Sequence, residues 1–173
     1  MKAIESKENL NQFLSEYNYQ PKLTQKLDCL DNVFITQQIL NEIVLWKVNR
    51  YIELNEEILR ALDKIKALDL KEHRQAENVL KMLLYTDGVY LPMASTFLRF
   101  RNPKVFQIID KHAYRAITDK KYPLYTSSPI ERKISLYFNY IDELWKLCEK
   151  RNLEFNTIDR LLYIFDKRFN GKL

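Results

Sequence analysis

The chain has 173 residues, with 28 Lys or Arg and 23 Asp or Glu, and a formal net charge of +5. Apolar residues make up 46% of it, enough to fill a packed core, and its charges are nearly balanced, which excludes a disordered polymer. The length indicates one domain, or two small lobes that share one core. Its two glycines, Gly88 and Gly171, are too few for glycine-rich phosphate loops, so we expect no nucleotide cofactor. Two cysteines, Cys29 and Cys148, cannot form an all-cysteine zinc site or hold an iron–sulfur cluster, so we expect no metal or other cofactor.

Charged residues occur throughout the chain and interrupt its apolar stretches. The longest segment without a charged residue, 88–98, is too short to cross a bilayer, and the first ten residues lack the apolar run of a signal peptide. We therefore expect a soluble, cytoplasmic protein without a membrane partner.

Apolar residues recur at helical spacing along most of the chain, and no comparable stretch alternates with period two. This pattern predicts an all-α fold. Two capping boxes, at Asp69 with Glu72 and at 128–131, predict helix starts, the second with Pro129 at the first helical position. In chain order the predicted helices are 4–17, 23–30, 33–52, 56–68, 70–85, 92–101, 111–118, 129–151 and 157–169.

The entire charge excess lies in one segment, 99–121, which holds seven basic and two acidic residues, while the rest of the chain is balanced. A concentrated basic segment indicates a polyanionic partner, and nucleic acid fits better than a membrane because Pro103 interrupts any long amphipathic run. We expect Arg99, Arg101 and Lys104 to contact DNA. The alternative is an ordinary solvated surface.

Gly88 lies in a short connection between the predicted helices 70–85 and 92–101. A glycine supplies the positive φ that a tight connection between two helices requires, and the start of the second helix offers backbone N–H groups to a phosphate. The alternative is a glycine C-cap followed by a proline helix start, with no ligand.

Asp110 lies eighteen residues after Pro92. It follows the apolar run 105–109 and precedes the sequence Lys-His-Ala-Tyr-Arg. With the Gly-Val pair at 88–89 and an alanine in the next helix, this segment resembles the helix-hairpin-helix superfamily of base-excision DNA glycosylases. In that family a Gly-Val hairpin precedes an alanine-containing helix and an Asp-x-His-x-aromatic-Arg run. The residues that match are Gly88, Val89, Ala94, Asp110, His112, Tyr114 and Arg115, within 28 of the 173 residues.

The resemblance implies a single helical domain, 1–173, of two lobes around a central cleft with a helix-hairpin-helix element. The lobes are expected at about 33–110 and at 1–32 plus 111–173. It makes Asp110 the catalytic carboxylate, which stabilises the oxocarbenium ion formed when the N-glycosidic bond breaks. The residues expected to contact DNA through this motif are Gly88, Val89, Tyr90, His112 and Arg115. The resemblance thus implies a monomeric DNA-repair hydrolase that removes a damaged or mispaired base.

Two positions depart from the family pattern. Tyr90 stands where family hairpins carry a second glycine, and Pro92 stands where bifunctional members carry a lysine that forms a Schiff base. A proline has no amine to offer, so a glycosylase here is expected to be monofunctional and to use water.

Other interpretations stay open. Asp110 also fits a helix N-cap, and His112 and His73 fit surface histidines. A non-enzymatic helical DNA-binding module is one alternative function, and a protein-interaction domain with an acidic partner is another. The sequence assigns no base-pocket residue. The candidates among its 22 aromatic residues are Trp46, Tyr85, Tyr90, Tyr137 and Trp145.

Overall fold

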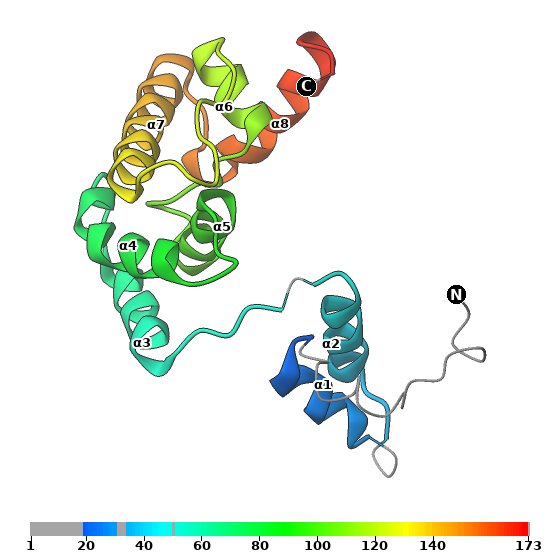
Figure 1. The fold of residues 1–173 in the computed structure, drawn as a ribbon. Coiled ribbons are helices and arrows are strands. Elements are labelled where there is room, and N and C mark those ends of the chain that lie inside the picture. Colours follow the sequence, from blue (N-terminus) through cyan, green and yellow to red (C-terminus); the bar gives the residue numbers. More distant parts are fainter. Residues whose placement is uncertain (1–18, 31–33, 50, 173) are drawn as a thin grey trace. The chain divides into compact units, whose positions relative to one another are not determined.

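A computed structural model describes residues 19–30, 34–49 and 51–172 (Figure 1). The helix expected at 4–17 lies outside the described residues. The chain divides into two compact units, Met1–Glu53 and Leu54–Leu173.

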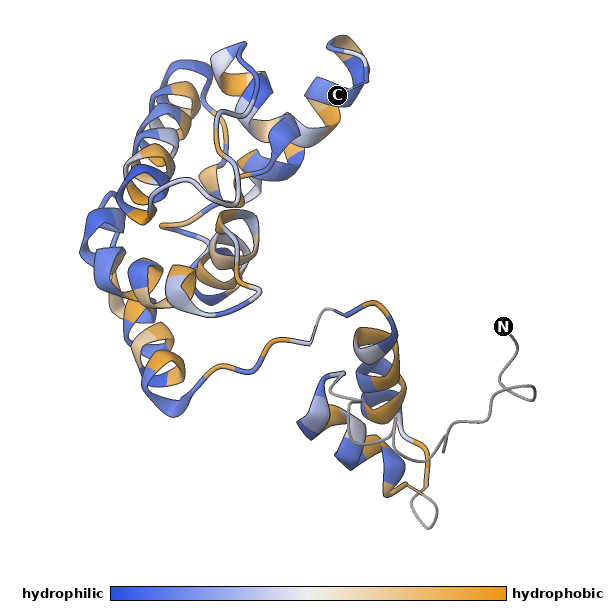
Figure 2. Ribbon diagram, in the orientation of Figure 1, coloured by the Kyte–Doolittle hydropathy of each residue, from blue (hydrophilic) through white to orange (hydrophobic). Residues whose placement is uncertain are grey.

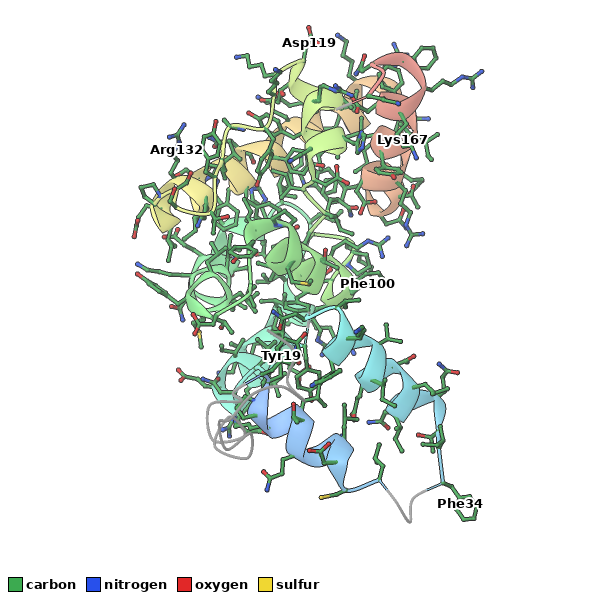
Figure 3. The ribbon with its side chains drawn as sticks, turned by 45° about the vertical axis from the view of Figure 1, so that its right-hand side comes forward. Tyr19, Phe34, Phe100, Asp119, Arg132 and Lys167 are labelled. Atoms are coloured by element: carbon green, nitrogen blue, oxygen red, sulfur yellow. The ribbon has the colours of Figure 1, made fainter. Side chains whose placement is uncertain are left out.

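In the first unit, α1 (Pro21–Asp28) packs against α2 (Gln37–Lys47). Pro21 lies in the first turn of α1, and the Thr36 hydroxyl accepts a hydrogen bond from Ile39 N at the start of α2. The Trp46 indole donates to Thr24 Oγ1 at 2.9 Å, and Tyr19 donates to Trp46 O at 2.8 Å. Trp46 therefore links the two helices. Phe34, just before α2, is 94% exposed (Figure 3).

The described residues of the second unit form six α-helices and three short 3₁₀ turns. The helices are α3 (Glu56–Lys64), α4 (Glu77–Tyr85), α5 (Leu91–Arg101), α6 (Lys111–Thr118), α7 (Ile130–Arg151) and α8 (Ile158–Phe169). The 3₁₀ turns are Ile65–Ala67, His73–Ala76 and Phe155–Thr157. The described residues form no β-strand, which confirms the predicted all-α class.

The core of the second unit forms along α7. Figure 2 shows polar residues along one side of α7 and apolar ones along the side that faces the rest of the unit. Tyr137, Ile141 and Leu144 are fully buried on that side, as their helical spacing predicts. The Tyr137 hydroxyl donates to Gln107 O at 3.0 Å, which anchors the 102–110 segment to α7. Burial raises the pKa of Tyr137 well above its usual range.

Helices α6, α7 and α8 gather at one end of the second unit, and α3, α4 and α5 at the other (Figure 1). Helix α6 packs against α8, while α4 packs against both α3 and α5 and also touches α7. The segment between α5 and α6 therefore connects the two groups of helices, and this segment carries Asp110.

Both predicted capping boxes differ from the structure. The Glu72 carboxylate does accept a hydrogen bond from Asp69 N at 2.8 Å, but the chain then forms a turn and the 3₁₀ segment, so α4 begins only at Glu77. At the second site Pro129 is the N-cap of α7 and not its first residue. Ser128 accepts instead from Tyr125 N, which stabilises the preceding loop.

His73 is buried and not the surface residue expected from its polar neighbours. Its ring packs against Phe138, with ring centroids 5.6 Å apart, and Nε2 lies 3.1 Å from Asp142 Oδ1. Burial lowers the pKa of His73, against the opposing effect of Asp142. The polar residues on either side of it remain at the surface, and only this side chain turns inward.

No helix among the described residues combines the length and the apolar character that a bilayer crossing requires.

Candidate functional site

The connection between α4 and α5 has the backbone that its glycine predicts. Gly88 adopts a φ of 79°, which is confirmed as the positive-φ position of the turn. Val89 N donates to Thr86 O at 3.0 Å, and the Val89 side chain is buried. Tyr90 is the N-cap of α5 but provides no side-chain cap, and its ring is 45% exposed.

Ser95 ties the start of α5 to the segment that carries Asp110. Its hydroxyl donates to Pro92 O at 2.8 Å and accepts a hydrogen bond from Ile109 N at 3.2 Å. Ser95 and Ile109 are both fully buried. Since Asp110 follows Ile109 directly, this buried link holds its backbone beside the first turns of α5.

Asp110 is the N-cap of α6, as one interpretation of the sequence predicted. Its Oδ1 accepts a hydrogen bond from Ala113 N at 2.7 Å. It is half-buried and also lines a surface hollow of about 230 Å³, here called the Asp110 hollow. The remaining lining residues are Ile108, Asp159, Arg160, Tyr163 and Ile164. Two carboxylates, an arginine and a tyrosine thus share one opening.

Asp159, on α8, is the second carboxylate of the Asp110 hollow and was missed by the sequence reasoning. It is buried and accepts hydrogen bonds from Arg160 N at 2.7 Å and from Ile108 N at 3.4 Å. Tyr140 donates from its hydroxyl to Ile108 O at 3.0 Å. Burial raises the pKa of Tyr140, and the neighbouring charges of Asp110 and Asp159 raise it further, so this phenol stays neutral beside the carboxylates.

His112 and Arg115, expected at DNA phosphates, both contact Asp166 on α8. Arg115 donates from Nε to Oδ1 at 2.9 Å and from Nη2 to Oδ2 at 2.8 Å, while His112 Nδ1 lies 2.7 Å from Oδ2. Asn170 donates to Oδ1 at 2.7 Å. Asp166 is fully buried, and the Arg115 guanidinium holds its pKa well below its usual range. The structure thus gives both side chains an internal role in joining α6 to α8.

The basic residues at the end of α5 differ in their surroundings. Arg99 is buried, donates to Asn156 O at 3.0 Å and lies 3.8 Å from Asp159. Arg101 pairs with Asp63 at 2.7 Å. Lys104 is exposed and, among the described residues, has no ion-pair partner. The other exposed basic residues of the predicted segment are Lys111, Lys120 and Lys121.

A second hollow, of about 190 Å³, lies at the start of α5 and is here called the tyrosine hollow. Its lining comes from the α4–α5 turn, the start of α5, the loop before α7, and α7 itself. The lining residues are Tyr90, Leu91, Pro92, Tyr122, Leu124, Tyr125, Thr126 and Lys133. It shares no lining residue with the Asp110 hollow. The structure therefore brings Tyr90 and Pro92 to one opening and Asp110 to another.

The aromatic candidates from the sequence are dispersed. Tyr137 is in the core, Trp145 stacks on Phe155 with ring centroids 3.9 Å apart, and Tyr85 is exposed. Of these candidates only Tyr90 lines one of the two hollows. In the described part of the chain no three His, Cys, Asp or Glu side chains gather as metal ligands.

Comparisons with protein families, with curated proteins and with solved structures find no match to this chain.

Proposed function

We propose that this protein binds double-stranded DNA and hydrolyses the N-glycosidic bond of a damaged or mispaired base, with Asp110 as the catalytic carboxylate. The proposal takes its chemistry from the resemblance of residues 88–115 to base-excision glycosylases. Support from the structure comes from the position of Asp110, half-buried at the mouth of a hollow.

One observation carries the proposal: the buried Ser95 hydroxyl bonds both Pro92 O and Ile109 N. The family motif needs its carboxylate to be held in a fixed relation to the helix that follows the hairpin. Ser95 provides such a link, because it connects the first turn of α5 to the residue before Asp110. A residue positioned by a buried hydrogen bond keeps its geometry during a reaction, as electrostatic stabilisation requires.

The chemistry proposed for Asp110 needs one carboxylate oxygen beside the sugar. Oδ1 accepts the Ala113 N–H, and no hydrogen bond to Oδ2 is found among the described residues. Oδ2 is thus available to stabilise the oxocarbenium ion or to orient water for attack on the sugar carbon. Because Pro92 has no amine, the proposed reaction releases the base and leaves an intact abasic strand.

A non-enzymatic DNA-binding module is the second candidate. It is favoured by the internal contacts of the motif residues, since Asp110 caps α6 while His112 and Arg115 bind Asp166. These contacts account for all three side chains without catalysis. DNA binding without turnover would then depend on the exposed lysines.

The experiment that separates the two candidates is an excision assay with duplexes that carry uracil, 8-oxoguanine, alkylated purines or thymine glycol. Each duplex is incubated with the protein and then treated with hot alkali, which cleaves abasic strands. Strand cleavage only after alkali, without borohydride trapping, supports a monofunctional glycosylase. Binding with no cleavage of any duplex contradicts the glycosylase and supports the module, and absence of DNA binding contradicts both.

A further inference from the structure

The tyrosine hollow holds a buried positive charge with no carboxylate beside it. Lys133 is 9% exposed, and its Nζ donates to Thr126 O at 2.8 Å. Among the described residues no carboxylate pairs with this ammonium group, whereas the other buried basic side chain, Arg99, has Asp159 nearby. An ammonium group has three N–H donors, and a carbonyl oxygen neutralises none of its charge. A buried, uncompensated charge that lines an opening favours an anionic ligand there.

The start of α5, whose Leu91 and Pro92 also line the hollow, adds backbone donors. Helix α5 has 11 residues, and Tyr90 gives its first turn no side-chain cap. Pro92 has no N–H, so the Leu91 and Met93 N–H groups are the ones left without an intrahelical acceptor. Helix N-termini favour anions such as phosphate through these donors and the helix dipole. Positive charge therefore reaches this hollow from two helices: Lys133 on α7 and the N-terminal end of α5.

Aromatic rings form the rest of this opening. Tyr125 is 80% exposed and Tyr90 is 45% exposed, and both line the hollow. The loop that carries Tyr125 is held in place, because Tyr125 N donates to Ser128 Oγ at 3.0 Å and Ser128 N donates to Tyr125 O at 3.0 Å. Exposed tyrosine rings, one of them on a loop held by hydrogen bonds, suit the stacking of a planar ring.

Tyr122 adds no negative charge to the hollow. Its ring meets Tyr114 edge-on, with ring centroids 5.5 Å apart. Burial raises its pKa to about 12, with a smaller contribution from Tyr114, so the phenol is neutral at physiological pH. The two residues before it in the chain are Lys120 and Lys121, both exposed. The local charge around this loop therefore favours an anion.

We propose that the tyrosine hollow binds an unpaired nucleotide of a single strand, with its phosphate at Lys133 and the start of α5 and its base against Tyr90 and Tyr125. The inference rests on the proposed function only in taking the partner to be DNA. A stacking ring and a buried ammonium group together match the two parts of a nucleotide, the base and the phosphate. A paired base does not fit this role, because both of its faces are stacked within the duplex.

The test is a binding titration of the full chain with a thymidine tetranucleotide that carries a 5′-phosphate and a fluorescent label at its 3′ end. This probe contains no lesion, so its binding is independent of whether the protein excises a base. Tyr125→Ala and Lys133→Met are each expected to weaken binding about tenfold or more, the order of one base–aromatic stack. Lys133→Arg, which keeps the charge, should retain most of the affinity.

The controls lie outside the tyrosine hollow. Phe169→Ala removes an exposed ring at the end of α8 that lines neither hollow, and Lys146→Met removes an exposed lysine from the same helix as Lys133. Both should bind the probe as the wild type does. Thermal unfolding of each variant checks the fold. If Lys133→Met does not fold, the test is decided by the probe affinity of Tyr90→Ala and Tyr125→Ala, because both tyrosines are exposed and their removal leaves the core intact.

Competition with unlabelled compounds identifies the ligand. The unphosphorylated tetranucleotide is expected to compete less well than the phosphorylated one, and inorganic phosphate and a blunt hairpin duplex should compete poorly. Equal competition by inorganic phosphate would show a simple anion site, and equal competition by the hairpin would show that pairing is irrelevant. Equal competition by thymidine 5′-monophosphate would show a site for free nucleotides. Each of these results overturns the proposal, as does wild-type affinity in both tyrosine variants.

Discussion

Arg115 binds Asp166 with two hydrogen bonds, from Nε to Oδ1 at 2.9 Å and from Nη2 to Oδ2 at 2.8 Å. Asp166 is fully buried on α8, and Arg115 is on α6, so this ion pair joins two helices that also pack against each other. A planar guanidinium that binds both oxygens of a carboxylate gives a geometrically specific contact. His112 and Asn170 complete the hydrogen bonds of the same carboxylate.

Asp166→Asn should lower the free energy of unfolding at neutral pH, because it removes the negative charge that Arg115 pairs with. The pKa of Asp166 is lowered by Arg115, so this carboxylate stabilises the fold above its unfolded pKa of about 3.9. That stabilisation is lost as the pH falls below this value. The difference between wild type and variant in urea unfolding should therefore narrow below about pH 4.

Glu143→Gln is the matched control for Asp166→Asn. It removes an exposed carboxylate that pairs with Lys146 at 2.6 Å on the surface of α7. Exposed pairs contribute little, so its stability should stay close to that of the wild type at every pH. If Asp166→Asn were as stable as this control, the Asp166 cluster would have no structural role.

His73 predicts a second, separate dependence of stability on pH. Burial lowers its pKa in the folded protein, so the unfolded chain binds a proton more readily than the folded one does. The free energy of unfolding should therefore fall as the pH drops below the unfolded pKa of about 6.5. His73→Gln should flatten this slope between about pH 7.5 and about pH 5.5. If the variant showed the same dependence of the free energy of unfolding on pH as the wild type, groups other than His73 would be responsible for it.

The helices of the second unit were predictable where local signals define them. The predicted bounds of α6, 111–118, agree with the structure because Asp110 caps its first turn through Ala113 N. Helices α5, α7 and α8 start within one residue of the prediction. The signals that define these helices are local: apolar residues recur every three or four positions, and the capping residues lie next to the first turn. A single sequence is therefore enough to recognise them.

The contacts that define the candidate sites connect distant segments and were not predictable. Arg115 and Asp166 are 51 residues apart, and Ser95 and Ile109 are 14 apart, so no local pattern pairs them. A count of charge along the chain treats Arg99 as a surface residue, although it is buried. Lys133 gives no signal in the sequence because a lysine on a helix is usually exposed, and only the fold reveals that it is enclosed.

DNA binding is expected to depend on the exposed part of the basic segment. Reversing its four exposed lysines to glutamate should weaken duplex affinity by more than about tenfold and lower the slope of log affinity against log salt by about 1 for each phosphate that is no longer neutralised. The lysines are Lys104, Lys111, Lys120 and Lys121. Fluorescence anisotropy at several salt concentrations measures both quantities.

The control for this charge reversal is a variant with four exposed basic residues reversed elsewhere in the second unit. These residues are Lys64, Lys66, Lys150 and Lys167; Figure 3 labels Lys167 on α8. Both variants change the net charge equally, so the long-range attraction to DNA falls equally in the two. A larger drop in affinity for the first variant therefore reports local contacts, and equal drops would contradict a specific role for the basic segment.

Asp110 allows capping and catalysis to be separated by two substitutions. Asp110→Asn keeps an oxygen that can accept the Ala113 N–H, so the fold should persist, but it removes the charge that would stabilise the oxocarbenium ion. Asp110→Ala removes the cap as well and should cost about 1 kcal/mol of stability. If the protein excises a base, both variants should lose on the order of 100-fold or more in the single-turnover excision rate. An Asp110→Asn variant that excised at the wild-type rate would leave Asp110 with capping as its whole role, because this variant keeps the capping oxygen and loses the negative charge.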